Sequence, residues 1–158
     1  KLLIADEPTT ALDATVELQV VELLKDLQRQ FGMAILFISH NLGVVAKLCD
    51  RVIVMYAGRV VESAPTADLF GRPLHPYAQA LLASIPRGSK HDGRLQAIQG
   101  EPPDLARLPG GCSFRPRCRR AVEACAEPQK LRAFGPYRRV ACHRAERVEA
   151  ETLVGEPA

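Results

Sequence analysis

The chain has 158 residues and a formal net charge of +3, and 47% of its residues are hydrophobic while 5% are aromatic. This length can hold one or two small domains with a buried core. No stretch approaches the roughly 20 consecutive apolar residues of a bilayer-spanning helix, and the amino end lacks the basic-then-apolar pattern of a secretion signal. We therefore expect a cytoplasmic protein without a membrane span.

The first residues place two acids at the end of an apolar strand. Residues 2–5 predict a strand buried on both faces of a parallel sheet, and Asp6 and Glu7 follow at its carboxyl end, where such sheets bind ligands. One carboxylate can hold Mg²⁺, directly or through water, while its neighbour polarises the water that attacks a terminal phosphate. A strand ending in Asp-Glu-Pro is also a common entry into a surface turn, and on these residues alone both interpretations stand.

A second apolar run, residues 35–38, leads to His40 after a helix-length spacer. Within that spacer, residues 16–31 carry apolar side chains at helical spacing, Asp13 or Thr15 can cap the helix, and a glycine follows its end. The pattern predicts a strand–helix–strand crossover whose two polar strand ends face one edge of the sheet.

In this order and spacing, the residues resemble the ATP-binding subunits of ABC transporters. The resemblance implies that Asp6 is the Walker B aspartate of the Mg²⁺ shell and that Glu7 is the catalytic glutamate that activates water. It also implies that His40 is the switch histidine that contacts the γ-phosphate of ATP, and that Asp13 of the D-loop crosses a dimer interface. Without the resemblance, a histidine after a strand is more often a helix cap or a satisfied core residue.

Two ATP-binding elements of that family are absent from these 158 residues. Neither the phosphate-binding pattern G-x-x-x-x-G-K-[ST] nor a Leu-Ser-Gly-Gly-Gln-like signature occurs. Both precede the Walker B strand in the family, so we expect a carboxy-terminal fragment of a longer ATPase that does not hydrolyse ATP by itself. The predicted fold class is α/β, the distal part of a P-loop, RecA-like ABC ATPase core with parallel strands and helices, followed by an irregular cysteine-containing extension.

Further elements follow in short pieces. Residues 42–48 predict a helix, and residues 51–55 and 59–62 predict a hairpin. Beyond Pro65, prolines separate two short predicted helices, 66–70 and 76–84, with proline at the first helical position of the second.

This change of composition suggests three parts of the chain. We expect the carboxy-terminal part of the nucleotide-binding domain in residues 1–64 and an accessory extension in residues 65–147. Residues 87–111 read as a linker or irregular arm because glycine, proline and charge dominate them. Residues 148–158 are expected to be a disordered tail.

Three sequence segments narrow the resemblance. The segment HPYAQALL at residues 75–82, Ile-Pro at 85–86 and GEPP at 100–103 resemble the extension of dipeptide, oligopeptide and nickel importer ATPases. The resemblance implies an ATP-hydrolysing subunit that powers import of small peptides, or of nickel. Its partners would be a second nucleotide-binding subunit, membrane permease subunits and, indirectly, a substrate-binding protein, at the cytoplasmic face of the inner membrane.

Four of the five cysteines lie close together in the carboxy-terminal half. Cys112, Cys118, Cys125 and Cys142 are separated by five, six and sixteen residues, whereas Cys49 stands apart and is expected to be a buried core residue. Disulfides are disfavoured among cytoplasmic reductants, which makes a metal centre the better interpretation. Zinc prefers shorter paired spacings, and four spread thiolates can wrap an iron–sulfur cluster. Spacing alone leaves a cluster, zinc and metal-free thiols open.

The cysteines themselves carry a resemblance. GCSFRPRC at residues 111–118 and VACH at 140–143 resemble the cysteine motif of peptide-importer ATPases, which carries a four-iron four-sulfur cluster. The resemblance implies a structural 4Fe-4S cluster on all four cysteines, with zinc as the alternative. The chain departs from the family at Ser113 and Arg115, where proline and histidine are frequent, and neither change removes a thiol. His143 is expected to lie outside the ligand set.

The charge of the cysteine-rich part is strongly positive. Residues 107–147 contain eleven Lys or Arg against three Glu, a balance of +8. Such a segment can bind nucleic acid or anionic lipid. Few aromatic residues are present for base stacking, and a thiolate-bound cluster is itself negative, so we favour local charge compensation and consider nucleic acid unlikely.

Two rival functions stay open at this point. The first is an ABC-type DNA-repair or chromosome ATPase with a metal-binding, nucleic-acid-contacting module. The second makes the cysteine-rich tail a redox-sensing or nucleic-acid-binding module rather than a structural one.

Overall fold

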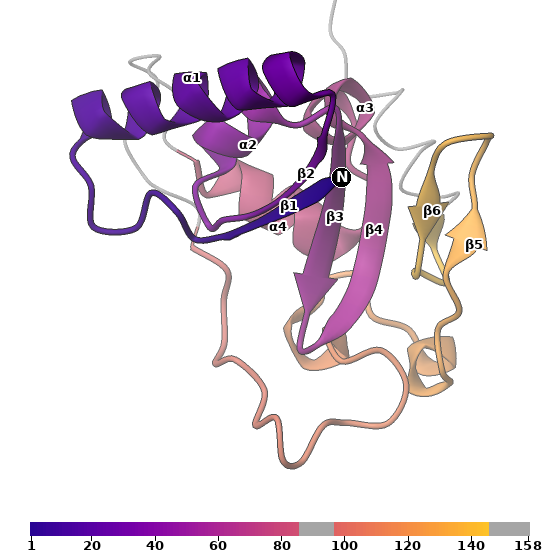
Figure 1. The fold of residues 1–158 in the computed structure, drawn as a ribbon. Helices are drawn as coiled ribbons and strands as arrows, with labels where there is room; N and C mark the ends of the chain where they lie inside the picture. The colour runs from indigo at the N-terminus through magenta and orange to yellow at the C-terminus, as the bar shows by residue number, and fades with distance from the viewer. Residues whose placement is uncertain (86–96, 146–158) are drawn as a thin grey trace, which may run out of the picture. The chain divides into compact units, whose positions relative to one another are not determined.

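A computed structural model of the protein describes residues 1–85 and 97–145 (Figure 1). The chain divides into two compact units, Lys1–Asp50 and Arg51–Ala158. The first unit contains β1 (Leu2–Asp6), α1 (Ala14–Phe31), β2 (Ala34–Ile38) and α2 (Leu42–Leu48). The second contains β3 (Arg51–Tyr56), β4 (Arg59–Pro65), α3 (Thr66–Gly71), α4 (Pro76–Ala83), the 3₁₀ turns η1 (Arg115–Arg117) and η2 (Glu123–Ala126), and the short strands β5 (Arg132–Ala133) and β6 (Arg139–Val140).

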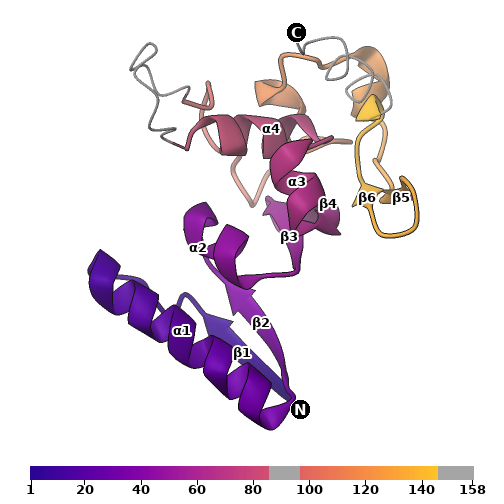
Figure 2. The ribbon, with the colours of Figure 1, turned by 90° about the horizontal axis from the view of Figure 1, so that it is seen from above.

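In the first unit, β1 and β2 form a parallel pair connected through α1, which lies along the two strands (Figure 2). The carboxylate of Asp13 accepts hydrogen bonds from the amides of Thr15 and Val16 and so caps α1, and Gly32 ends the helix in the left-handed conformation that favours glycine. The predicted strand–helix–strand crossover is confirmed.

The predicted burial of β1 on both faces is wrong. Leu2 and Ile4 are 62% and 61% exposed, and Leu36 and Ile38 of β2 are also exposed. Among the described residues β1 pairs only with β2, and one helix can cover only one face of two strands. The apolar run is therefore correct as a strand but not as a strand enclosed on both sides.

Asn41 connects α2 to α1. Its side-chain oxygen accepts hydrogen bonds from the amides of Gly43 and Val44 at the start of α2. Its amide nitrogen donates to both carboxylate oxygens of Glu17, at 3.1 and 3.0 Å. Because one side chain binds both helices, the backbone at His40, the residue before it, is fixed relative to α1.

The second unit is built on an antiparallel sheet with the order β3-β4-β6-β5. The β3–β4 hairpin turns through Ala57 and Gly58, both with positive φ, as a two-residue hairpin turn requires. The predicted hairpin and both short helices are confirmed. Strands β5 and β6 were not predicted, because two residues each are too short to show an alternating pattern.

The pairing of β4 with β6 places the hairpin in the same compact unit as the cysteine-rich extension. Along the sequence, the boundary between the two structural units therefore falls after Asp50. The boundary after residue 64, between an ATPase core and an extension, stays a prediction. Part of the predicted linker, residues 87–96, and the predicted tail, residues 148–158, lie outside the described residues. Among the helices of the described ranges, none combines the length and the apolar character that crossing a bilayer requires.

A buried carboxylate holds the second unit together. Glu62 of β4 is fully buried and accepts hydrogen bonds from the amides of Leu74 and His75, the latter at 2.7 Å. The guanidinium of Arg138 donates to the same carboxylate at 3.1 and 2.6 Å, and also to the carbonyl of Arg72. One side chain thus joins β4, the turn before α4 and the segment before β6.

We expect Arg138→Ala to lower the free energy of unfolding by about 3–5 kcal/mol, because it leaves the buried Glu62 carboxylate without its cation. Arg139→Ala is the matched control, since the adjacent Arg139 is exposed. That change should cost less than about 0.5 kcal/mol. Denaturant unfolding followed by circular dichroism measures both, and equal effects of the two changes would contradict the assigned role of the ion pair.

Candidate functional site

The first candidate site lies at the carboxyl ends of β1 and β2. The amide of Glu7 donates to the carbonyl of Ile38 at 2.8 Å, so the two strand ends lie side by side. Glu7 itself has a φ of 45°, a left-handed conformation that ends the strand abruptly at the acid. The two polar strand ends therefore meet at one edge, as the sequence predicted.

Glu7 and His40 are in direct contact. Nδ1 of His40 lies 3.1 Å from Oε1 of Glu7, and because a carboxylate only accepts, Nδ1 carries the hydrogen. The hydroxyl of Thr10 donates to the other carboxylate oxygen at 2.8 Å. The hydrogen bonds from His40 and then Thr10 lower the pKa of the Glu7 carboxyl below its usual range. Glu7 is therefore an ionised, solvent-accessible base with a fixed orientation.

The other two predicted site residues have different surroundings. Asp6 is exposed at the last position of β1, next to Glu7, where its carboxylate is open to a cation. Asp13 is engaged as the cap of α1. Sequence reasoning missed Thr10, although a hydroxyl three residues after an acid in a turn is a recognisable pattern for a local side-chain hydrogen bond.

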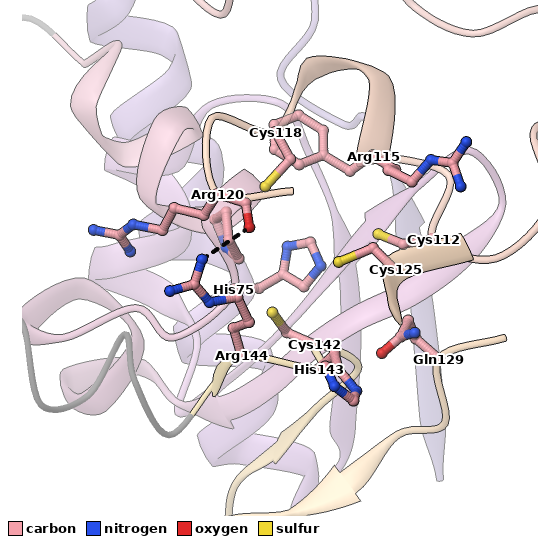
Figure 3. Close-up of a pocket in the computed structure, with 12 residues that line it drawn as sticks. His75, Cys112, Arg115, Cys118, Arg120, Cys125, Gln129, Cys142, His143 and Arg144 are labelled. Carbon is pink, nitrogen blue, oxygen red and sulfur yellow. Dashed lines mark hydrogen bonds between the residues drawn. The ribbon is translucent and has the colours of Figure 1, made fainter. Parts of the chain in front are cut away.

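The second candidate site is a cavity in the extension. Its lining includes all four clustered cysteines, and Figure 3 shows their sulfur atoms around a common space. The empty space within the walls of this cavity, counted together with the solvent at its opening, is about 350 Å³. The same walls contain His75, Phe114 and three arginines, Arg115, Arg120 and Arg144.

Backbone contacts bring the cysteines together across the sequence. The amide of Cys112 donates to the carbonyl of Cys125 at 3.0 Å, and Cys118 ends the η1 turn by donating to Arg115. Gly111 makes the first contact possible: its φ is 77°, and a Cβ there would lie 2.4 Å from the carbonyl oxygen of Cys125. Cys142 comes from the segment after β6.

The thiols are in a partly dry environment. Burial raises the pKa of Cys112, of Cys118 and of Cys142, the last to about 11. The other three thiols raise the pKa of Cys142 further, while the backbone amide of Arg144 lowers it. Four neighbouring sulfurs in this setting become thiolates most readily when a cationic centre compensates their charge.

The cysteine cavity contains thiols that are not cross-linked. Cys112, Cys118, Cys125 and Cys142 form no disulfide. Within residues 1–85 and 97–145, no three His, Cys, Asp or Glu side chains form a group that could hold a metal ion. The four cysteines nevertheless line one common cavity.

Comparison with known proteins shows which proteins the chain is similar to. The family described as "Oligopeptide/dipeptide transporter, C-terminal region" matches residues 61–125. The oligopeptide transport ATP-binding protein OppD of Salmonella typhimurium is 52% identical over 90% of this chain and 42% of its own length. OppD of Haemophilus influenzae is 52% identical over 85% of the chain and 42% of its own length, and AppD of Bacillus subtilis is 56% identical over 79% and 38%.

Over most of its length the chain is therefore similar to ATP-binding proteins of oligopeptide transport. It spans about two fifths of the length of these curated relatives. None of the three is named as a DNA-repair or chromosome ATPase, so the comparisons give that rival no support. The matched C-terminal region contains His75 and three of the four cavity cysteines, whereas Cys142 lies beyond it.

His75 is the residue of the second site that sequence reasoning used only as a family marker. It is 1% exposed, and burial lowers its pKa to about 4, so the ring is neutral. Its Nδ1 accepts a hydrogen bond from the amide of Tyr77 at 3.0 Å and caps α4. A histidine directly before a proline at the first position of a helix was the available sequence signal.

We expect Gly111→Ala to destabilise the extension by at least about 1–3 kcal/mol, because it adds a strained left-handed conformation and a clash with the Cys125 carbonyl. Gly110→Ala is the matched control, since a Cβ there would meet only one atom, at 3.9 Å. Thermal denaturation compares the two variants. A melting temperature for Gly111→Ala equal to that of the control would refute the close approach.

Proposed function

We propose that the protein is the carboxy-terminal part of an ATP-binding and hydrolysing subunit that powers ABC-type import of di- or oligopeptides across the cytoplasmic membrane. Two observations support the proposal. The first is the similarity to OppD along 90% of the chain. The second is the contact between Glu7 and His40 at one sheet edge, which carries the assignment of the catalytic site.

In the proposed reaction, the ionised Glu7 carboxylate accepts a proton from the water that attacks the γ-phosphate of ATP. His40 orients this base through its Nδ1–H. Asp6 offers the carboxylate oxygens that Mg²⁺ prefers, and Mg²⁺ would neutralise charge on the phosphates. The phosphate loop and signature would come from other parts of the subunit pair, since these 158 residues lack both patterns.

The proposed partners are a second ATP-binding subunit, membrane permease subunits and, through them, a substrate-binding protein. The subunit would lie at the cytoplasmic face of the membrane as a peripheral component. Asp13 would take part in the dimer interface through the turn that it closes before α1, since its carboxylate also caps that helix. In this arrangement, closure of two subunits on ATP would drive the permease.

We expect Glu7→Gln in the full-length subunit, assembled with its partner, to retain ATP binding and to lose at least about 10²-fold in hydrolysis rate, since the amide does not accept the proton. Glu22→Gln is the matched control on the exposed side of α1 and should leave turnover unchanged. Phosphate release and nucleotide binding are measured in parallel. Normal hydrolysis by the Glu7 variant would exclude Glu7 as the base.

For the second site, we propose a 4Fe-4S cluster held by Cys112, Cys118, Cys125 and Cys142. Four thiols that line one cavity are the donor set that such a cluster takes, and three arginines in the walls would offset its negative charge. The cluster would join η1, η2 and the segment after β6, which supports a structural role. These arginines are three of the eleven basic residues of this segment, so the cluster would compensate part of its charge without nucleic acid.

Anaerobic purification of the full-length subunit should yield about four iron and four sulfide per chain. Cys112→Ser should lower the iron content, whereas Cys49→Ser should not, because Cys49 does not line the cavity. Elemental analysis and sulfide determination measure the result. Stoichiometric zinc without iron would refute the proposed cluster and favour zinc as the bound metal.

A further inference from the structure

A buried donor without a partner faces the cysteine cavity. Nε2 of His75 has no hydrogen-bond partner among the described residues, although the side chain is 1% exposed. His75 lines the same cavity as the four cysteines, and Figure 3 shows its ring facing the space between their sulfur atoms. A buried polar group without a hydrogen bond costs about 1–3 kcal/mol of folding free energy, so we expect a group in the cavity to pair with Nε2.

The tautomer of His75 follows from its other nitrogen. Nδ1 accepts the hydrogen bond of the Tyr77 amide, and a neutral imidazole has one donor and one acceptor nitrogen. Nε2 therefore carries the hydrogen and points a donor, not a lone pair, at the cavity. To bind iron through Nε2, the neutral ring would have to carry its hydrogen on Nδ1 instead. That Nδ1–H would then face the N–H of Tyr77, and the hydrogen bond that caps α4 would be lost.

The backbone on both sides of His75 is also fixed. Its amide donates to the buried Glu62 carboxylate at 2.7 Å, and Pro76 begins α4 immediately after it. The ring is further confined by Phe114, whose centroid lies 6.1 Å away. The donor direction is therefore set by the fold before any group enters the cavity.

We propose that Nε2–H of His75 donates a hydrogen bond to a sulfur atom of the group held by Cys112, Cys118, Cys125 and Cys142, and thereby stabilises its reduced form. This inference rests on the cluster proposed above. A hydrogen bond to a cluster sulfur favours the state with more negative charge, and so it raises the reduction potential. His75 is thus a tuning residue and not a ligand.

Two substitutions separate the donor from the helix cap. In His75→Asn, the side-chain oxygen can still accept from the Tyr77 amide, but no donor reaches the position of Nε2. In His75→Gln, the amide nitrogen reaches that position, while the helix cap is weakened. If His75 served only as the helix cap, His75→Gln would be the less stable of the two variants and would differ more from the wild type.

The test uses the full-length subunit, purified anaerobically and first assayed for iron and sulfide. The one-electron midpoint potential is measured by titration with dithionite, and pulsed electron paramagnetic resonance of the reduced cluster in D₂O detects an exchangeable deuteron. Backbone amides such as that of Arg144 also donate to the cysteine sulfurs and give deuteron couplings of their own, so the number of couplings is compared. We expect the wild type and His75→Gln to show the same couplings and similar potentials. His75→Asn should show one coupling fewer and titrate at a lower potential.

Each other outcome contradicts a specific claim. An unchanged potential and coupling in a cluster-containing His75→Asn variant would overturn the role of His75 and leave the cluster proposal intact. A strong nitrogen coupling in the wild type would overturn it too, because it would make His75 a ligand. A wild-type protein without iron and sulfide would overturn the cluster itself, together with this inference.

Discussion

The second unit depends on one buried carboxylate. Glu62 lies on β4, yet it accepts hydrogen bonds from the turn before α4 and from the guanidinium of Arg138, which lies 76 residues further along the chain. A buried charge is tolerated only when cations and donors surround it, and here each donor belongs to a different part of the extension. The same carboxylate holds the amide of His75, so it fixes the residue that faces the cysteine cavity. Sheet pairing, the start of α4 and the geometry of the second site thus have a common origin.

Much of the fold could be predicted because its elements carry local signals. The helical spacing of residues 16–31, the glycine after it and the apolar runs on either side predicted α1 between two parallel strands, and the proline at position 76 marked the start of α4. The signals failed where structure depends on distant partners. Strand β6 consists of two residues that pair with Glu62 and Ser63, and no pattern of two residues can reveal this. The burial of β1 was overestimated because apolar composition reports what a strand can bury, not what covers it.

The two candidate sites also differ in how far they could be predicted from the sequence. Glu7 and His40 could be paired in advance, since ends of adjacent parallel strands meet at one edge and the resemblance to ABC ATPases supplied their roles. The four cysteines could be grouped by sequence, although their backbone contacts, such as the one between Cys112 and Cys125, required the structure. His75 could not be assigned to the cavity at all, because its direction depends on the Tyr77 amide and on Glu62. The similarity to OppD supports the proposed role of the first site, while the second site rests on the four cysteines that line one cavity.

Native-state hydrogen exchange at the amides of Leu74 and His75 tests the central claim most directly. Both amides precede α4 in a turn, where exchange is fast unless the acceptor is firmly held. The Glu62 arrangement predicts protection comparable to that of the amides paired between β3 and β4. Exchange as fast as at the exposed residues 104–107 would show that the carboxylate does not hold this turn, and would contradict the account.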